Sequence, residues 1–226
     1  MMARVAGQVP ATPVVRLKVT EIFHSIQGEG LTAGVPTVFV RLTGCPLRCS
    51  YCDTAYAFSG GQYLELPQIL ERVRAFETRH VTVTGGEPLA QVGALDLLRA
   101  LCDGGYAVSL ETSGALDVAN VDRRVVRVLD LKAPSSGECG RNLYANLALL
   151  QPGDQVKFVL ADRADYEWAL GTARQYDLAE RASVLFSPVW GRLDPAMLAD
   201  WMLADRVPYR LQLQLHKILW GEAPGR

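Results

Sequence analysis

The sequence predicts an α/β fold, a partial and open β/α TIM-like barrel of about six units. Short apolar runs rich in β-branched residues alternate with segments of helical periodicity along the chain. Near-continuous apolar strands separated by helices are typical of a parallel sheet that helices cover. The chain of 226 residues is also short for a complete eight-unit barrel. A doubly wound parallel sheet is the alternative fold.

Eight apolar runs have the composition expected of strands. In chain order these runs are Val19–Phe23, Thr37–Leu42, Val81–Thr84, Ala107–Glu111, Val126–Leu131, Gln155–Leu160, Ser183–Ser187 and Tyr209–Leu215. Helical patterns lie between several of them. These patterns cover Pro67–Phe76, Ala94–Cys102, Leu143–Leu149, Ala164–Tyr176 and Pro195–Leu203.

One catalytic domain is expected over residues 19–226, after a flexible arm over residues 1–18 whose Pro and Gly content favours a loose chain. The formal net charge of −1 gives no electrostatic reason to expect nucleic acid or an anionic membrane as a partner. No run of about 20 apolar residues is present, and the N-terminus lacks the apolar core of a signal peptide. Five cysteines, three of them clustered, favour a metal site in the reducing cytoplasm over a disulfide framework.

Glycine and polar residues follow the expected strands at their carboxyl ends, where α/β proteins place their chemistry. Gly44 and Cys45 follow one strand, and Gly85, Gly86 and Glu87 follow the next. Farther along the chain the same position is taken by Thr112, Ser113, Gly114, Lys132 and Ser187. We therefore expect one site at this edge of the sheet.

Three cysteines, Cys45, Cys49 and Cys52, occupy eight positions in "TGCPLRCSYCDT". Structural zinc takes four protein ligands, and the two other cysteines, Cys102 and Cys139, lie far away in the sequence. A 4Fe–4S cluster normally has a thiolate on each iron. Three thiolates leave one iron open for a small molecule, so we expect a cluster, with zinc as the alternative.

This loop resembles the CxxxCxφC signature of radical S-adenosylmethionine (SAM) enzymes, with the aromatic Tyr51 before the last cysteine. The resemblance implies the partial barrel fold. It also implies that SAM chelates the open iron and that one electron from the cluster cleaves SAM to a 5′-deoxyadenosyl radical. The segment "VTVTGGEPL" supports it independently, because its glycines permit close approach of a ligand and Glu87 can accept from a cationic amino group.

The segments "EIFHSIQGEG", "DLKAPSSG", "QVKFVL" and "LQLQLHKILWG" make the chain resemble the 7-carboxy-7-deazaguanine synthase family from about Val19 to Pro224. The resemblance implies a carbon–nitrogen lyase of queuosine and deazapurine biosynthesis. Its pterin substrate, 6-carboxy-5,6,7,8-tetrahydropterin, becomes 7-carboxy-7-deazaguanine with loss of ammonia. SAM is regenerated in this reaction, and family members also use Mg²⁺.

The resemblance assigns residues to the substrate, to SAM and to the metals, with the 5′-deoxyadenosyl radical in place of a catalytic side chain. Substrate binding is assigned to Ile26, Gln27, Gly28, Glu29, Arg41, Thr112 and Pro224. SAM binding is assigned to Tyr51, Cys52, Asp53, Gly86, Glu87, Gly114, Gln155, Val156, Lys157 and Ser187. The cluster ligands are Cys45, Cys49 and Cys52, and the Mg²⁺ ligand is Thr54.

The chemistry of several side chains fits these assignments. Gln27 and Glu29 can pair with the donors and acceptors of a pterin edge, and Arg41 can hold a carboxylate through a bidentate fork. Mg²⁺ prefers oxygen ligands and often keeps several waters, so the Thr54 hydroxyl with substrate oxygens and water would suffice. The alternatives are a polar turn for "QGEG", a surface ion pair for Arg41 and a capping role for Thr54. In the family the tail near Pro224 folds back toward the substrate.

Other features leave alternatives open. His216 and Lys217 are a pterin contact or a strand cap, and Cys139 has no assigned role. Another radical SAM enzyme, such as a glycyl-radical activase, and a non-catalytic cluster or zinc protein are the alternative functions. The expected partners are a flavodoxin or ferredoxin as electron donor and a second copy in a homodimer. Trp190, Trp201 and Trp220 would lie in its interface or in the core.

Overall fold

The computed structural model describes residues 14–223 and 225. Its strands are β1 (Arg16–Ile26), β2 (Pro36–Leu42), β3 (Gln62–Glu65), β4 (His80–Gly85), β5 (Ala107–Thr112), β6 (Val126–Leu131), β7 (Gln155–Leu160), β8 (Ser183–Pro188) and β9 (Arg210–Leu211). Its α-helices are α1 (Leu66–Arg74), α2 (Ala94–Asp103), α3 (Arg163–Gln175), α4 (Pro195–Ala204) and α5 (Leu215–Trp220). Its 3₁₀-helices are η1 (Ala55–Phe58), η2 (Pro88–Ala90), η3 (Pro134–Ser136), η4 (Cys139–Arg141), η5 (Tyr144–Leu149) and η6 (Leu178–Glu180).

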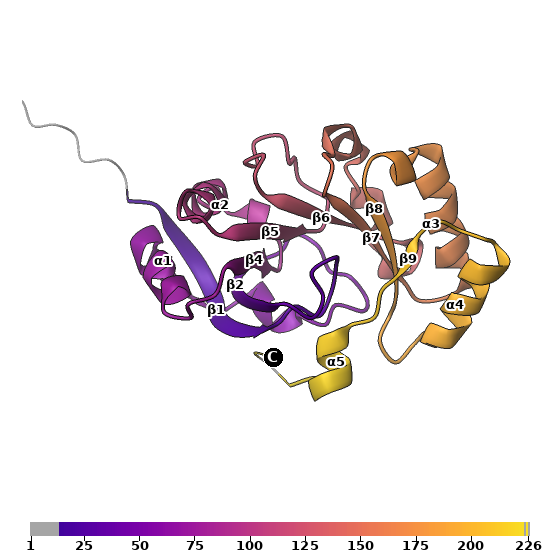
Figure 1. The fold of residues 1–226 in the computed structure, drawn as a ribbon, viewed down its shortest axis with the longest axis horizontal. Coiled ribbons are helices and arrows are strands. Elements are labelled where there is room, and N and C mark those ends of the chain that lie inside the picture. Colours follow the sequence, from indigo (N-terminus) through magenta and orange to yellow (C-terminus); the bar gives the residue numbers. More distant parts are fainter. Residues whose placement is uncertain (1–13, 224, 226) are drawn as a thin grey trace, which may run out of the picture.

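The strands of the described residues form one nine-stranded sheet in the order β3-β1-β2-β4-β5-β6-β7-β8-β9. From β2 to β9 every neighbouring pair is parallel, whereas β1 is antiparallel to both β2 and β3. The edge strands β3 and β9 lie at opposite ends and do not pair with each other. Figure 1 shows β1, the neighbour of β3, far from β9. The sheet is therefore open, which confirms the partial barrel that the sequence predicts.

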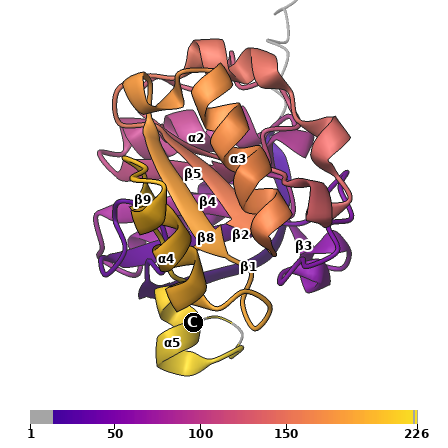
Figure 2. The same ribbon diagram turned by 90° about the vertical axis from the view of Figure 1, so that its right-hand side faces the viewer.

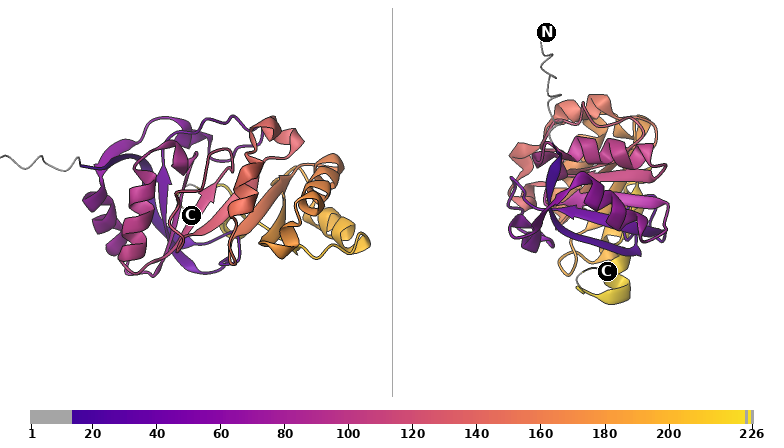
Figure 3. Two further views of the ribbon diagram at one scale, coloured as in Figure 1. Left: turned by 90° about the horizontal axis from the view of Figure 1, so that it is seen from above. Right: turned by 90° about the vertical axis from the view of Figure 1, so that its left-hand side faces the viewer.

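Helices cover one face of this sheet. Alternate strand residues such as Val40, Val83 and Leu110 pack with α1 and α2 in one hydrophobic cluster. Residues of β6, β7 and β8 pack with α3 and α4 in a second cluster. Figure 2 shows α3 and α4 covering the β7–β8 end, and the left panel of Figure 3 shows α1 and α2 at the other end. None of the helices in the described part of the chain combines the length and apolar composition that a membrane crossing requires.

The N-terminal boundary differs from the expected one. Strand β1 begins at Arg16, and Leu17 is fully buried in the core. The folded domain therefore begins before residue 19, because Arg16, Leu17 and Lys18 pair with β3. Residues 1–13 of the expected arm lie outside the described residues.

Two expected elements near the site also differ. The expected helix Leu143–Leu149 is instead the 3₁₀-helix η5 (Tyr144–Leu149), in which the side-chain amide of Asn146 bonds the carbonyls of Gly114 and Leu116. The expected strand Tyr209–Leu215 shortens to β9, and α5 begins at Leu215. The chain leaves the sheet there because the Leu215 N–H donates to the Gly28 carbonyl at 3.0 Å. The short strand β3 was not expected.

Candidate active site

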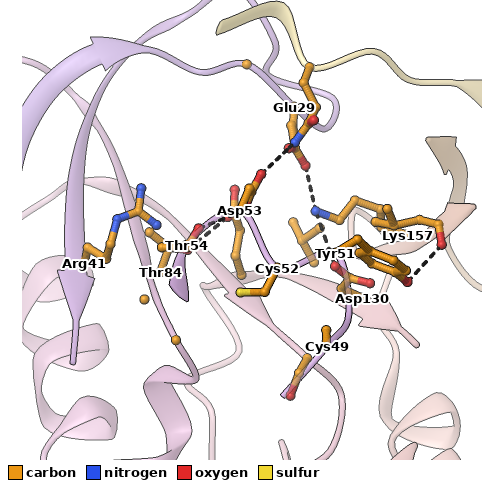
Figure 4. A pocket seen from close by; sticks show the side chains of 18 of the residues that line it. Glu29, Arg41, Cys49, Tyr51, Cys52, Asp53, Thr54, Thr84, Asp130 and Lys157 are labelled. Carbon is orange, nitrogen blue, oxygen red and sulfur yellow. Dashed lines mark hydrogen bonds and ion pairs between the residues drawn. The ribbon is translucent and has the colours of Figure 1, made fainter. Parts of the chain in front are cut away.

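The uncovered face of the sheet presents polar side chains that alternate with the core residues. The strand register places Arg41 beside Thr84, and the Thr84 hydroxyl donates to Glu111 at 3.0 Å. Farther along the sheet it places Asp130 beside Lys157. These five residues come from five neighbouring parallel strands and line one cavity of about 460 Å³ (Figure 4). Successive strand residues point to opposite faces, so near-continuous apolar strands still supply a polar wall.

The cysteine loop forms the next wall of the same cavity. Cys45, Cys49 and Cys52 all line the cavity as half-buried free thiols. Gly86 after β4 makes this approach possible, because a Cβ atom there would lie 2.4 Å from the Gly44 carbonyl oxygen. The sequence therefore places a glycine where the GGE turn and the cysteine loop touch.

The chemistry of this loop fits an iron–sulfur cluster. The Leu47 N–H donates to the Cys45 sulfur at 3.4 Å, and hydrogen bonds to sulfur are a feature of cluster loops. Burial raises the pKa of the Cys45 and Cys49 thiols, an effect that a bound cationic centre reverses. Among the described residues, no three Cys, His, Asp or Glu side chains converge on a point that one metal ion could occupy. The structure thus offers no single-ion zinc cage on this loop.

A charged network crosses the cavity floor. The Lys157 ammonium lies 2.6 Å from a Glu29 carboxylate oxygen and 3.6 Å from one of Asp130, and the Lys132 ammonium lies 3.0 Å from the same Asp130 oxygen. Burial lowers the pKa of Lys157, but attraction to Glu29, Asp130 and Glu111 outweighs it and holds that pKa well above the usual value. Burial raises the pKa of Glu29, but Lys157 outweighs it and lowers the net value. Burial also raises the pKa of Glu111 above its usual value.

Helix α5 closes the cavity from the C-terminal side. The side-chain amide of Gln214 donates to Glu29 at 2.8 Å and to Asp53 at 3.2 Å. The Lys217 ammonium lies 3.0 Å from Asp53. His216 packs against the "QGEG" turn so closely that a Cβ atom on Gly28 would lie 2.0 Å from its Nδ1. Helix α5 thereby joins the N-terminal turn to the cysteine loop.

Asp53 and Thr54 extend the cysteine loop along the cavity wall. The Thr54 hydroxyl donates to Asp53 at 2.9 Å, which leaves the lone pairs of its oxygen for a cation. Burial raises the pKa of Asp53, but attraction to Lys217 outweighs it and holds that pKa well below the usual range. A hydroxyl beside an ionised carboxylate suits a hard cation such as Mg²⁺.

The structure brings most residues predicted from the sequence into one place. The predicted residues that line the cavity are Ile26, Gln27, Gly28, Glu29, Arg41, Cys45, Cys49, Tyr51, Cys52, Asp53, Thr54, Gly86, Thr112 and Lys157. Those outside its lining are Glu87, Gly114, Gln155, Val156 and Ser187. Pro224 lies outside the described residues.

Glu87 lies behind the cavity wall. Its side chain is fully buried, and its carboxylate accepts from the Thr112 hydroxyl, from the N–H and hydroxyl of Ser113 and from the Leu89 N–H. Its predicted contact with SAM stays a prediction. In the structure Glu87 joins the loops after β4 and β5, which positions Thr112 at the cavity.

The residues of β7 and β8 that were predicted to bind SAM do not all point to the same face of the sheet, because successive strand residues point to opposite faces. The Val156 side chain points to the opposite face from Lys157 and is fully buried in the cluster of α3, and the predicted contact of this residue with SAM stays a prediction. Gln155 shares the face of Lys157, but its side-chain oxygen accepts from the Leu31 N–H at 3.0 Å. Ser187 is buried beside Val159, which does line the cavity. Gly114, which follows β5, is also outside the cavity lining, and its carbonyl accepts a hydrogen bond from the side-chain amide of Asn146.

Sequence reasoning missed several residues of the cavity. The missed residues that take part in its polar contacts are Thr84, Glu111, Asp130 and Gln214, together with Gln212, which bonds Glu29 from outside the lining. Thr84, Glu111 and Asp130 could have been found from the sequence. Each is a polar residue inside an apolar strand, at a position whose side chain points to the same face of the sheet as those of Arg41 and Lys157. The amides of "LQLQ" alternate like strand residues, so their turn toward Glu29 had no local signal.

Comparison with known proteins places these observations in a family. The profile of the "Radical SAM superfamily" matches residues 39–132. The chain is 50% identical to the 7-carboxy-7-deazaguanine synthase of Chlorobaculum tepidum over 91% of this chain and 94% of that protein. It is 42% identical to the protein of that name from Koribacter versatilis over 90% of this chain and 97% of the relative.

The chain belongs to the 7-carboxy-7-deazaguanine synthase family. The radical SAM profile ends before β7 and α5, whereas the matches to the 7-carboxy-7-deazaguanine synthases extend over nearly the whole length of both chains. Membership in the 7-carboxy-7-deazaguanine synthase family, rather than in the superfamily alone, therefore rests on more of the chain than the cysteine loop and the GGE turn.

Solved structures agree on the fold. QueE from Escherichia coli matches with a TM-score of 0.70 at 22% identity, over 89% of this chain and 95% of that chain. Streptococcus suis SuiB bound to its precursor peptide SuiA matches with a TM-score of 0.57 at 13% identity, over 76% of this chain and 46% of that chain. These likenesses concern the open α/β fold alone.

Proposed function

We propose that this protein converts 6-carboxy-5,6,7,8-tetrahydropterin to 7-carboxy-7-deazaguanine with loss of ammonia, as a radical SAM lyase of queuosine and deazapurine biosynthesis. One observation supports the proposal above all others. The cysteine loop, the "QGEG" turn and α5 meet around one cavity, in a chain that matches 7-carboxy-7-deazaguanine synthases over nearly its whole length. A cavity of about 460 Å³ lies within the range of pockets that hold small ligands.

In this proposal Cys45, Cys49 and Cys52 hold a 4Fe–4S cluster whose fourth iron is left for SAM. SAM, when bound and reduced there, supplies the 5′-deoxyadenosyl radical that takes a hydrogen from the substrate. The chain orients SAM through residues beside the loop. Tyr51 is fixed for this by a hydrogen bond of 3.1 Å from its hydroxyl to the Val159 carbonyl, and Asp53 and Gly86 line the same wall.

The pterin is proposed to lie between the "QGEG" turn and the polar face of the sheet. Gln27 is oriented by a bond of 3.1 Å from its amide to the Thr82 hydroxyl, and Glu29 is held ionised by Lys157. Arg41 donates its Nε–H to Glu21 at 2.7 Å, which orients the guanidinium. Its Nη groups have no acceptor among the described residues, so they can bind the pterin carboxylate as a fork. Ile26, Gly28 and Thr112 complete this part of the wall.

A Mg²⁺ ion on Thr54 is part of the proposal. Thr54 lines the cavity and its hydroxyl donates to Asp53, so an ion bound to the hydroxyl oxygen would complete its shell with substrate oxygens and water. The ion would add positive charge near a negatively charged substrate and thereby fix the position of that substrate.

The proposal includes two partners and a compartment. A small one-electron carrier, a flavodoxin or ferredoxin, would reduce the cluster. A homodimer is proposed because the α4–α5 region exposes large apolar side chains, among them Met197, Leu203, Ile218 and Leu219. Trp190 is 43% exposed and suits such an interface, whereas Trp201 is partly buried and packs on Tyr166. The reducing cytoplasm is the proposed location, because it keeps thiols and cluster intact.

Anaerobic reconstitution followed by one assay tests the proposal. We expect about four irons and four sulfides per chain, and 7-carboxy-7-deazaguanine and ammonia only when SAM, reductant and the pterin are all present. The Cys49→Ala variant should lose both iron and activity. The Cys102→Ala variant is the matched control, because Cys102 is buried on α2 in the core. A reconstituted wild-type protein that leaves the pterin unchanged would overturn the proposed activity.

A further inference from the structure

The turn that follows β6 packs against the cysteine loop, and its contacts have no part in the function proposed above. The Ser50 N–H donates to the Ser136 carbonyl at 2.9 Å, and the Ser50 hydroxyl donates to the Ser135 carbonyl at 2.7 Å. The Arg48 N–H donates to a carboxylate oxygen of Glu138 at 2.6 Å. The turn thus holds the chain on both sides of Cys49.

Among these contacts, only the one from Glu138 reaches the loop through a side chain of the turn. It satisfies the N–H of the residue directly before Cys49 in place of water. The side chain of Arg48 turns back over the same stretch, and its Nη1 donates to the carbonyls of Cys45 at 2.8 Å and Leu47 at 2.7 Å. Its guanidinium also stacks 4.3 Å from the centre of the Phe58 ring. The stretch between Cys45 and Cys49 is therefore held from outside by Glu138 and from within by Arg48.

The turn itself is anchored on the body of the protein. The Ser136 hydroxyl donates to the Ala133 carbonyl at 2.6 Å and accepts from the Glu138 N–H at 3.0 Å. The Ser135 N–H donates to Asp165 at 3.0 Å, and the Ser135 hydroxyl bonds the other oxygen of that carboxylate. Asp165 is buried in the first turn of α3. Glu138 therefore acts on the loop from a rigid base.

We propose that Glu138 is a positioning residue that preorganises the cysteine loop for its cluster. This inference rests on the proposed function to the extent that the loop binds a cluster. A loop that already has its ligating shape loses less conformational freedom when the metal centre binds, so the centre is held more tightly. Without the Glu138 oxygen the peptide before Cys49 is free to turn to water, and the Cys49 thiolate moves with it.

Iron release from the reconstituted protein tests this proposal without SAM, pterin or turnover. The variants are E138A, which removes the acceptor, and E138Q, which keeps an acceptor oxygen but not the charge. The control is E71A, because Glu71 is an exposed residue of α1 outside the cavity lining. We expect E138A to release iron to a chelator about tenfold faster than wild type, because this variant loses one hydrogen bond to the loop. E138Q and E71A should stay within about twofold.

The outcomes separate the inference from the proposed function. If E138A releases iron at the wild-type rate, or if E138Q releases it as fast as E138A, positioning by this hydrogen bond is wrong. If wild type binds no cluster under conditions that leave it folded, the proposed function itself fails. Thermal unfolding of the cluster-free proteins checks that the variants fold. Should E138A not fold, E138D replaces it, because its shorter side chain keeps the charge but withdraws the acceptor from Arg48.

Discussion

The Lys157 ammonium lies 2.6 Å from the carboxylate of Glu29, although the two residues are 128 positions apart in the chain. Both side chains are mostly buried, with 11% and 15% of their surface exposed. Asp130 and Glu111 lie near the same ammonium, so Lys157 balances several acids in one cavity. This position makes Lys157 a determinant of stability as well as of the site.

We expect Lys157→Met to lower the free energy of unfolding by about 3 kcal/mol, since removal of one partner leaves buried carboxylates without a cation. Urea denaturation of the cluster-free protein measures this loss. Lys157→Arg keeps the charge and should recover much of it. The double variant with Glu29→Gln should lose less than the sum of the single changes, and strict additivity would contradict the coupling.

The Asp53–Lys217 ion pair predicts that the free energy of unfolding decreases at acid pH. Burial raises the pKa of Asp53 but Lys217 lowers it below the ordinary value of 3.8, so the pair stabilises the fold above that pH. The contribution disappears as the pH falls through the lower folded-state pKa. We expect a modest effect, because 45% of the Asp53 side chain is exposed. Lys217→Met should destabilise the protein at about pH 7 and flatten its loss of stability below about pH 4; parallel pH profiles would argue against the pair.

Thr54→Ala should raise the Mg²⁺ concentration needed for half-maximal activity by about tenfold or more, through loss of a protein oxygen ligand. A Mg²⁺ titration of product formation measures it. Thr54→Ser retains the hydroxyl and should behave like wild type. An unchanged Mg²⁺ requirement in Thr54→Ala would remove Thr54 from the metal site.

Gly28→Ala should displace His216 and with it α5. Its Cβ atom would lie 2.0 Å from the His216 Nδ1, so the ring must move, at a cost of about 1–3 kcal/mol. We expect lower activity and faster proteolysis after α5 is loosened. Gly140→Ala is the matched control, because a Cβ atom at Gly140 meets no atom within 4 Å. Equal activity of the two variants would show that the contact with His216 is not needed.

The parallel sheet could be predicted because most of its strands are recognisable in the sequence as short apolar runs. In the runs Thr37–Leu42 and Gln155–Leu160, alternate apolar side chains are buried in the core between the sheet and the helices. This pattern is visible in each run without knowledge of the rest of the chain. Their polar residues, Arg41 and Lys157, then had to face the other side. The same alternation would have indicated Asp130.

The C-terminal segment could not be predicted in this way. "LQLQL" has the alternation of a strand, yet only Arg210–Leu211 pairs with β8. The amides of Gln212 and Gln214 instead bond Glu29, which is more than 180 residues away. The buried position of Glu87 likewise depends on Thr112 and Ser113 of another strand end. The positions of these side chains depend on hydrogen-bond partners that are distant in the sequence and meet only in the folded protein.

The contact between the Leu215 N–H and the Gly28 carbonyl joins a late segment of the chain to an early one, so the cavity can close only after Leu215 has been made. The cysteine loop leaves the ribosome early, whereas α5, Glu222 at the cavity and Gly225 near Glu21 come last. A nascent chain that stops before Leu215 lacks one wall around its three thiols. The cysteine loop is therefore complete, and open on the α5 side, before the last wall of the cavity is made.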